Sequence, residues 1–212
     1  MITRNPIRLK LERMISVYKI KPAFQQLLKP ILTFLHKLGV TANVITWSAI
    51  FLSIATGAFA WFYPEKNALL ILPLALLVRM ALNALDGMMA RTYNMQSKQG
   101  EILNELGDLI SDFIMFAPLY FLFKLNVFVL IAFLFLSMVN EFTGILGKAV
   151  SGERRYEGPM GKSDRALVVG LFSLISFFTE ALIPYSNHTF IVICGLLILS
   201  TGVRIAKTLK VK

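Results

Sequence analysis

Acidic residues are scarce in this chain of 212 residues, which has 12 Asp and Glu against 22 Lys and Arg. Charged residues make up only 16% of the sequence, whereas about 25% is usual in soluble domains. There is a single cysteine, Cys194, so an internal disulfide is excluded. The mean hydropathy of +0.67 and the 56% of hydrophobic residues exclude a disordered chain, a coiled coil and a soluble fold, and indicate an integral membrane protein.

Six segments are candidates for membrane spans, because each offers close to the roughly 20 mostly apolar residues that a span needs. They run over residues 44–63, 68–89, 102–123, 127–146, 166–183 and 190–205. The sequence therefore predicts an all-α protein with six transmembrane helices in a domain over residues 43–212. Charges run through residues 1–42, which excludes a signal peptide there.

The segment over residues 1–42 is predicted to be cytoplasmic or interfacial. Within it, residues 22–38 place apolar side chains at helical spacing, with lysines on the other positions. This pattern is typical of an amphipathic helix that lies on the surface of a bilayer.

The basic residues sort to one side of the predicted bundle. With six spans both termini lie on the same side, and every Lys and Arg except Lys66 and Lys124 falls in a segment of that side. The positive-inside rule makes this side cytoplasmic. We therefore expect a multi-pass membrane protein, in the inner membrane if its source is bacterial, with both termini and the active site in the cytoplasm. We expect the lipid bilayer, and no nucleic acid, as the partner of these charges.

The few acidic residues are concentrated, with five of the twelve between Asp86 and Asp112. A carboxylate at membrane depth is costly and indicates a functional site. One predicted helical face carries Asn83, Asp86, Gly87 and Ala90, and a face of the next helix carries Gly100, Asn104, Asp108 and Asp112. Oxygen ligands without histidine or cysteine favour a hard cation such as Mg²⁺ or Mn²⁺.

A purely structural reading of the same residues stays open at this point. Small residues allow close helix packing, and the acids could pair with Arg79, Arg91 or Lys98.

The spacing of these residues resembles the signature of the CDP-alcohol phosphatidyltransferase family, D-x2-D-G-x2-A-R-x8-9-G-x3-D-x3-D. The agreeing positions are Asp86, Gly87, Ala90, Arg91, Gly100 and Asp108. Asn83 and Asn104 stand where the family has its first and third aspartates. The stretch over residues 38–46 also resembles the family's approach to its first span, with Ala42 in place of the usual proline.

The resemblance implies a metal-dependent transferase of phospholipid biosynthesis. A CDP-alcohol, expected to be CDP-diacylglycerol, would give its phosphatidyl group to a hydroxyl acceptor with release of CMP. The implied metal ligands for Mg²⁺ or Mn²⁺ are Asp86, Asp108, Asn83 and Asn104, and Asp108 is also the implied catalytic base. The implied nucleotide contacts are Asn43, Gly87, Ala90, Arg91 and Gly100. The family also leads us to expect a homodimer.

The two asparagines leave three outcomes open. An asparagine oxygen can ligate a hard cation but brings no charge, so a two-metal site would be held less tightly. The site could bind one metal, recruit Asp112, Glu101 or Glu105 as a substitute, or have lost catalysis. Asp112 is the substitute that we predict among the metal ligands, because it lies one helical turn beyond Asp108 on the same face.

The connection between the fourth and fifth predicted spans is rich in basic residues. Its stretch Asp164-Arg165-Ala-Leu resembles the Glu-Arg-Leu of the family branch that uses inositol phosphate. The resemblance implies that Arg165 contacts the acceptor, and that a phosphorylated polyol is among the candidate acceptors. Further candidate contacts are Lys162, Arg154 and Arg155. Alternatively, these charges set the topology and bind lipid headgroups.

Two other functions compete with this prediction. A weakened member of the family would bind a CDP-alcohol or lipid without turnover. A transporter would use the carboxylates to line a path, but transporters more often show repeated halves with broken helices, and no repeat is visible in the sequence.

Overall fold

The computed structural model describes residues 21–210, which are helical throughout apart from turns and connections. The elements are α2 (Lys21–Lys37), α3 (Ala42–Phe62), α4 (Lys66–Thr92), α5 (Lys98–Phe116), α6 (Leu119–Leu122), α7 (Val127–Ser151), α8 (Lys162–Phe178), η2 (Glu180–Tyr185) and α9 (Ser186–Thr208). No strand occurs among the described residues, so the predicted all-α class is confirmed. Of the predicted N-terminal segment, residues 1–20 lie outside the described part.

Four stretches of the described chain are long and apolar enough to cross a membrane. They are α3, α4, α7 and the run Glu180–Thr208 that η2 and α9 form together. α8 has only 17 residues, and α5 carries four acidic residues in its 19. A multi-pass membrane protein is therefore supported, while the count of six spans stays a prediction.

Two predicted spans are interrupted in the structure. The span predicted over residues 102–123 breaks after Phe116, and α6 follows with Pro118 as its N-cap. The span predicted over residues 166–183 breaks at Thr179, where the extended backbone separates α8 from η2. Pro118 has no backbone N–H to continue a helical ladder, which explains the first break. The hydrophobicity of the sequence alone reveals neither the break after Phe116 nor the break at Thr179.

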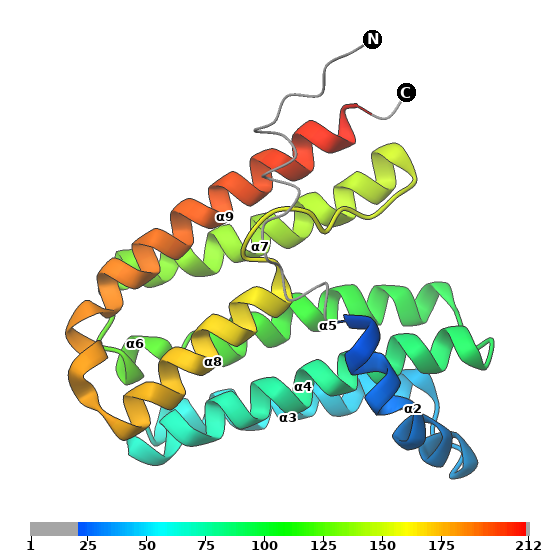
Figure 1. Ribbon diagram of the computed structural model, residues 1–212, viewed down its shortest axis with the longest axis horizontal. Coiled ribbons are helices and arrows are strands. Elements are labelled where there is room, and N and C mark those ends of the chain that lie inside the picture. The colour runs from blue at the N-terminus through cyan, green and yellow to red at the C-terminus, as the bar shows by residue number, and fades with distance from the viewer. Residues whose placement is uncertain (1–20, 211–212) are drawn as a thin grey trace.

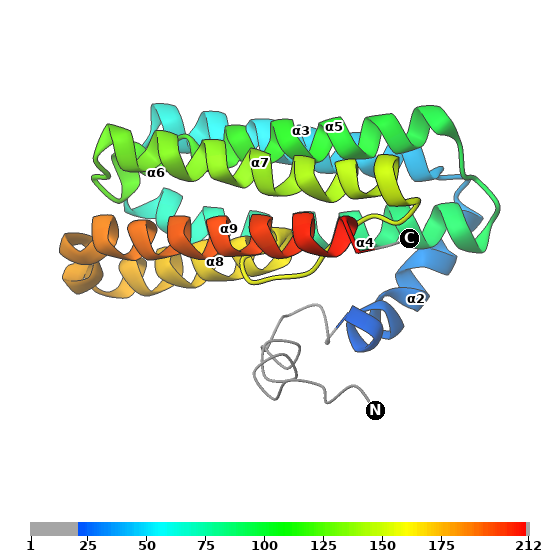
Figure 2. The same cartoon turned by 90° about the horizontal axis from the view of Figure 1, so that it is seen from above.

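The long helices lie side by side in one bundle (Figures 1 and 2). α3 packs against α4 and α5, α4 packs against α8, and α7 packs against α9. The connection from α4 to α5 lies at the end of the bundle opposite α6 and η2 (Figure 1). The two ends of α4 therefore face different surroundings.

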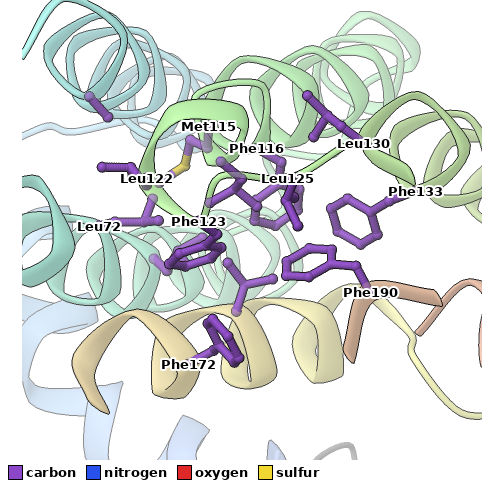
Figure 3. Close-up of a cluster of buried hydrophobic side chains, with 14 of the residues drawn as sticks. Leu72, Met115, Phe116, Leu122, Phe123, Leu125, Leu130, Phe133, Phe172 and Phe190 are labelled. Atoms are coloured by element: carbon purple, nitrogen blue, oxygen red, sulfur yellow. The ribbon is translucent and has the colours of Figure 1, made fainter. Parts of the chain in front are cut away.

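An apolar core fills the part of the bundle close to α6 (Figure 3). The Phe123 and Phe172 rings lie 4.8 Å apart between centroids, and the Phe133 and Phe190 rings lie 5.0 Å apart. The first half of α4 contributes Leu72 to this core. The second half of α4 carries the polar residues of the family pattern, so the core and the polar cluster lie toward opposite ends of the same helix.

Helix α2 packs one apolar side against the bundle. Leu28 and Leu32 are buried in a second cluster with residues of α3 and α4, whereas Leu27, Ile31 and Phe34 are exposed. A row of exposed apolar side chains on a helix beside a membrane bundle supports the predicted interfacial position.

Candidate active site

The family pattern on α4 and α5 comes together in the structure as a contact between its first and last positions. The side-chain amide of Asn83 on α4 donates to Asp108 Oδ1 on α5 at 3.1 Å. Asp86, one turn further along α4, is buried with 5% of its surface exposed. The two halves of the pattern therefore face each other, as the spacing predicted.

A cavity of about 540 Å³ opens beside this contact. All five predicted nucleotide contacts line it: Asn43, Gly87, Ala90, Arg91 and Gly100. Two of the predicted metal ligands, Asp86 and Asn104, line it as well. Asn83, Asp108 and Asp112 are not part of its lining, so the structure divides the predicted metal ligands between the cavity and the interior behind it.

Thr46 on α3 is a cavity residue that the sequence did not single out. Its hydroxyl donates to Asp86 Oδ2 at 3.0 Å, and it also donates to the Ala42 carbonyl at 3.1 Å. Asn43 and Thr46 are three residues apart, which places two polar side chains on one face of the first span. That spacing was visible in the sequence, but the partner on α4 was not.

Gly100 leaves room for a side chain of the neighbouring helix. A Cβ at Gly100 would lie 2.8 Å from Asn43 Oδ1, which is closer than side chains tolerate. A Cβ at Gly87 would lie 3.2 Å from Arg91 Nη1. These glycines therefore shape the cavity wall by letting Asn43 and Arg91 lie close to the backbone.

Asp108 is surrounded by positively charged and N–H groups. Lys162 at the start of α8 forms an ion pair with Asp108 Oδ1, the oxygen that also accepts from Asn83. Arg79 Nη2 lies 3.6 Å from that oxygen and donates to the Asp108 backbone carbonyl at 3.1 Å. The side chain of Asp108 is 16% exposed, so these partners act on a mostly buried carboxylate.

Asp112 is held by two buried arginines. Arg79 Nη1 donates to Asp112 Oδ1 at 2.5 Å, and Arg165 Nη2 donates to Asp112 Oδ2 at 2.7 Å. Arg165 also donates to Glu141 Oε1 at 3.2 Å. A metal ion at Asp112 would have to displace a guanidinium, and the pairing with Arg79 matches the structural alternative from the sequence.

Each predicted acceptor contact is paired with an acid. Arg154 pairs with Glu105 and lies 3.3 Å from Glu141. Arg155 lies 3.2 Å from Glu153, and Arg165 and Lys162 hold Asp112 and Asp108. The structure brings Lys162 to the pattern residues, but places Arg155 in a separate group with the acids of its own loop.

The loop between α7 and α8 contains two groups whose pKa values are shifted. Burial lowers the pKa of Arg154, but the negative charges of Glu105 and Glu141 are among the influences that outweigh it, and the net pKa lies above the ordinary value. Burial raises the pKa of Glu157, but backbone N–H donors and Lys207 outweigh it and the net pKa lies below the ordinary value. Arg154 and Glu157 therefore both favour their charged forms.

The donor chemistry is that of a hard-cation site with few charges. Within residues 21–210, no three His, Cys, Asp or Glu side chains gather as metal ligands. Asp86 and Asn104 nevertheless offer carboxylate and carboxamide oxygens to the cavity, which are the ligand types that Mg²⁺ and Mn²⁺ prefer. The residues fit a divalent cation, with fewer charges than four aspartates would give.

Comparison with known sequences places these features in one family. The model of the CDP-alcohol phosphatidyltransferase family matches residues 39–201. The inner membrane protein YnbA of Escherichia coli (strain K12) is 48% identical over 159 residues, which cover 75% of this chain and 79% of that protein. An uncharacterized protein of Aquifex aeolicus (strain VF5) is 33% identical over 101 residues, which cover 48% of this chain and 50% of that protein.

Solved structures with the same fold include the phosphatidylinositol phosphate synthase of Mycobacterium tuberculosis. Its structure with CDP-DAG bound gives a TM-score of 0.71 at 21% identity, covering 85% of this chain and 92% of that chain. Its complex with manganese and citrate gives 0.70 at 23% identity, covering 85% and 88%. With the family match spanning the cavity and the polar cluster behind it, the chain belongs to the CDP-alcohol phosphatidyltransferase family.

Proposed function

We propose that the chain transfers a phosphatidyl group from CDP-diacylglycerol to the hydroxyl group of an acceptor, with release of CMP. The observation that carries this proposal is the cavity of about 540 Å³, where all the predicted nucleotide contacts meet Asp86 and Asn104. A protein of the same fold was crystallised with CDP-DAG, which supports the choice of CDP-linked alcohol.

The nucleotide would occupy the cavity between α3, α4 and α5. Gly87 and Ala90 would let it approach the α4 backbone, and Asn43 and Arg91 would offer an amide and a guanidinium. An arginine at this edge suits phosphate oxygens, because the guanidinium donates several hydrogen bonds at once.

Asp86 and Asn104 would hold a divalent cation, Mg²⁺ or Mn²⁺. The family pattern also implies Asn83 and Asp108 as ligands, but these two side chains contact each other behind the cavity, and Asp108 is paired with Lys162. The bound cation would neutralise charge on the pyrophosphate.

In the transfer, the acceptor oxygen would form a bond to the β-phosphorus. The bond from that phosphorus to the bridging oxygen would break, and this oxygen would leave with CMP. Asp108 would take the hydroxyl proton, since it is the carboxylate at the last position of the pattern.

The acceptor site would lie beside Lys162, where α8 begins. A phosphorylated polyol would have to compete with Glu105 and Glu141 for Arg154, and with Asp112 and Glu141 for Arg165. An uncharged polyol would meet no such competition. Both acceptor classes therefore belong in the test, with Arg155 as the more distant contact.

For the whole protein, we propose a membrane topology and a dimeric assembly. We place both termini and the active site in the cytoplasm, take α5 and α8 as the third and fifth spans, and expect a homodimer. The excess of basic residues on one side supports this orientation.

The decisive experiment measures CMP release by the purified full-length chain in lipid nanodiscs. CDP-diacylglycerol is supplied with a panel of uncharged and phosphorylated polyols, with Mg²⁺, Mn²⁺ or EDTA. We expect CMP release that needs an acceptor and stops with EDTA, and that is lost in Asp86→Asn. CDP-diacylglycerol binding without CMP release on any acceptor would contradict the proposal and favour a member that binds lipid without turnover.

A further inference from the structure

Four residues of the family pattern, Asn83, Asp86, Asn104 and Asp108, form a polar cluster on α4 and α5. The two asparagines remove two negative charges from this cluster, and Lys162 brings a positive charge to it. The Lys162 ammonium forms an ion pair with Asp108, and its side chain is only 22% exposed. A lysine therefore lies inside the cluster rather than at its rim.

The position of Lys162 is fixed by its neighbours. It is the first residue of α8, whose start is capped by the Gly161 N–H donating to Asp164 Oδ2 at 3.2 Å. Three residues on, the fully buried Arg165 is held by Asp112 and Glu141, and donates to the Met160 carbonyl at 3.2 Å. Hydrogen bonds and ion pairs therefore fix the backbone before and after Lys162, which keeps its ammonium beside Asp108.

The charges around Asp108 leave little attraction for a divalent cation on that side. Lys162, Arg79 and the Asn83 amide all converge on Asp108 Oδ1. On the cavity side, the Asp86 carboxylate accepts from the neutral Thr46 hydroxyl, and Asn104 lines the same cavity. The cavity is also lined by Arg91, Lys98 and Lys148, but no ion pair among residues 21–210 involves Asp86. The two sides of the cluster therefore differ in electrostatic character.

From this difference we infer that Lys162 serves as a built-in cation at Asp108, so that the site holds a single divalent cation on its Asp86 and Asn104 side. The inference rests on the proposed function. The ammonium supplies positive charge beside the base without a second metal ion, and the Asn83 amide adds an N–H donor to the same carboxylate oxygen. Lys162 thus has a positioning and electrostatic role toward Asp108 in place of a simple acceptor contact.

The test counts bound Mn²⁺ on the purified full-length chain in detergent, with CDP present, from the EPR signal of free Mn²⁺. We expect one Mn²⁺ per chain. Lys162→Gln is expected to bind Mn²⁺ at least about tenfold more tightly or to gain a second ion, because a like charge is removed at short range. Lys162→Arg keeps the charge and should match the wild type.

Lys207→Gln is the matched control, because it also removes a lysine from an ion pair, here with Glu157 at 3.3 Å, away from the cluster. It should leave Mn²⁺ binding unchanged. Two ions or none on the wild type, unchanged binding in Lys162→Gln, or an equal shift in Lys207→Gln would overturn the inference. The Mn²⁺ count on the wild type does not depend on whether a variant folds. Because Mn²⁺ binding is measured without turnover, a lack of CMP release would contradict the proposed function but not this inference.

Discussion

The two carboxylates that survive from the family pattern have different surroundings. Asp86 faces the cavity and accepts from one hydroxyl, whereas Asp108 lies behind it among Lys162, Arg79 and Asn83. Asp86 is therefore open to a ligand in the cavity, whereas the proposed role of Asp108 as a base rests on its place in the family pattern. The residues can be tested separately.

Thr46→Val should weaken the use of metal without destroying the site. The hydroxyl orients the Asp86 carboxylate, and loss of such an outer partner typically costs about 10- to 100-fold in metal affinity or activity. The Mg²⁺ concentration for half-maximal CMP release should rise accordingly. Ser53→Ala on the same helix is the control, since Ser53 donates to a backbone carbonyl at 2.7 Å instead. An equal rise in both variants would contradict the orienting role.

Asp108→Asn should lower kcat for CMP release by about 100- to 10,000-fold, as expected when a general base is lost. The binding of CDP-diacylglycerol should change little, because Asp108 does not line the cavity. Glu180→Gln makes the same change of carboxylate to carboxamide at the start of η2 and should leave kcat intact. Full turnover in Asp108→Asn would rule out its role as the base.

At the scale of helices, the close packing of α3 and α5 keeps the cavity walls in place. A Cβ at Gly57 would lie 2.5 Å from the Ile114 carbonyl oxygen, so Gly57→Ala must push the two helices apart. We expect a loss of about 1–3 kcal/mol in unfolding free energy, the usual cost of overpacking. Gly195→Ala, on α9 in open space, should be neutral or slightly stabilising. The melting temperatures in detergent compare the two, and equal values would contradict tight α3–α5 packing.

A substitution of Arg165 tests whether its buried ion pairs with Asp112 and Glu141 stabilise the fold. Arg165→Gln would leave Asp112 and Glu141 without a shared guanidinium, and breaking a buried pair costs about 3–5 kcal/mol. We expect a lower melting temperature together with lost activity. If the melting temperature stays and only the KM for the acceptor rises, Arg165 is an acceptor contact as the resemblance implied.

The elements show where sequence reasoning succeeded and where it ended. The i, i+3 and i+4 spacing on α4 and α5 predicted that the two halves of the pattern face each other, and the hydrogen bond from Asn83 to Asp108 agrees with this. The prediction was possible because helical geometry is local. The ion pair from Lys162 to Asp108 joins residues on α5 and α8, and the hydrogen bond from Thr46 to Asp86 joins α3 and α4. Such contacts depend on how distant helices pack, which no spacing in one segment reveals.

At the scale of the whole molecule, cysteine labelling tests the proposed orientation in the membrane. With Cys194 replaced by serine, single cysteines at Lys66, Lys124, Lys98 and Lys207 report the two sides. We expect a membrane-impermeant thiol reagent to label positions 66 and 124 from outside intact cells, and positions 98 and 207 only after permeabilisation. The reverse pattern would contradict a cytoplasmic site.

The division of α4 between an apolar half and a polar half has a consequence for how this protein can change. Leu72 packs with the phenylalanine core, while Asp86 and Arg91 line the cavity at the other end. Because the cavity lining and the core around Phe133 and Phe190 share no residue, we expect substitutions in the cavity to leave that packing in place. The polar half of α4 can therefore vary in sequence while its apolar half keeps the helix in the bundle.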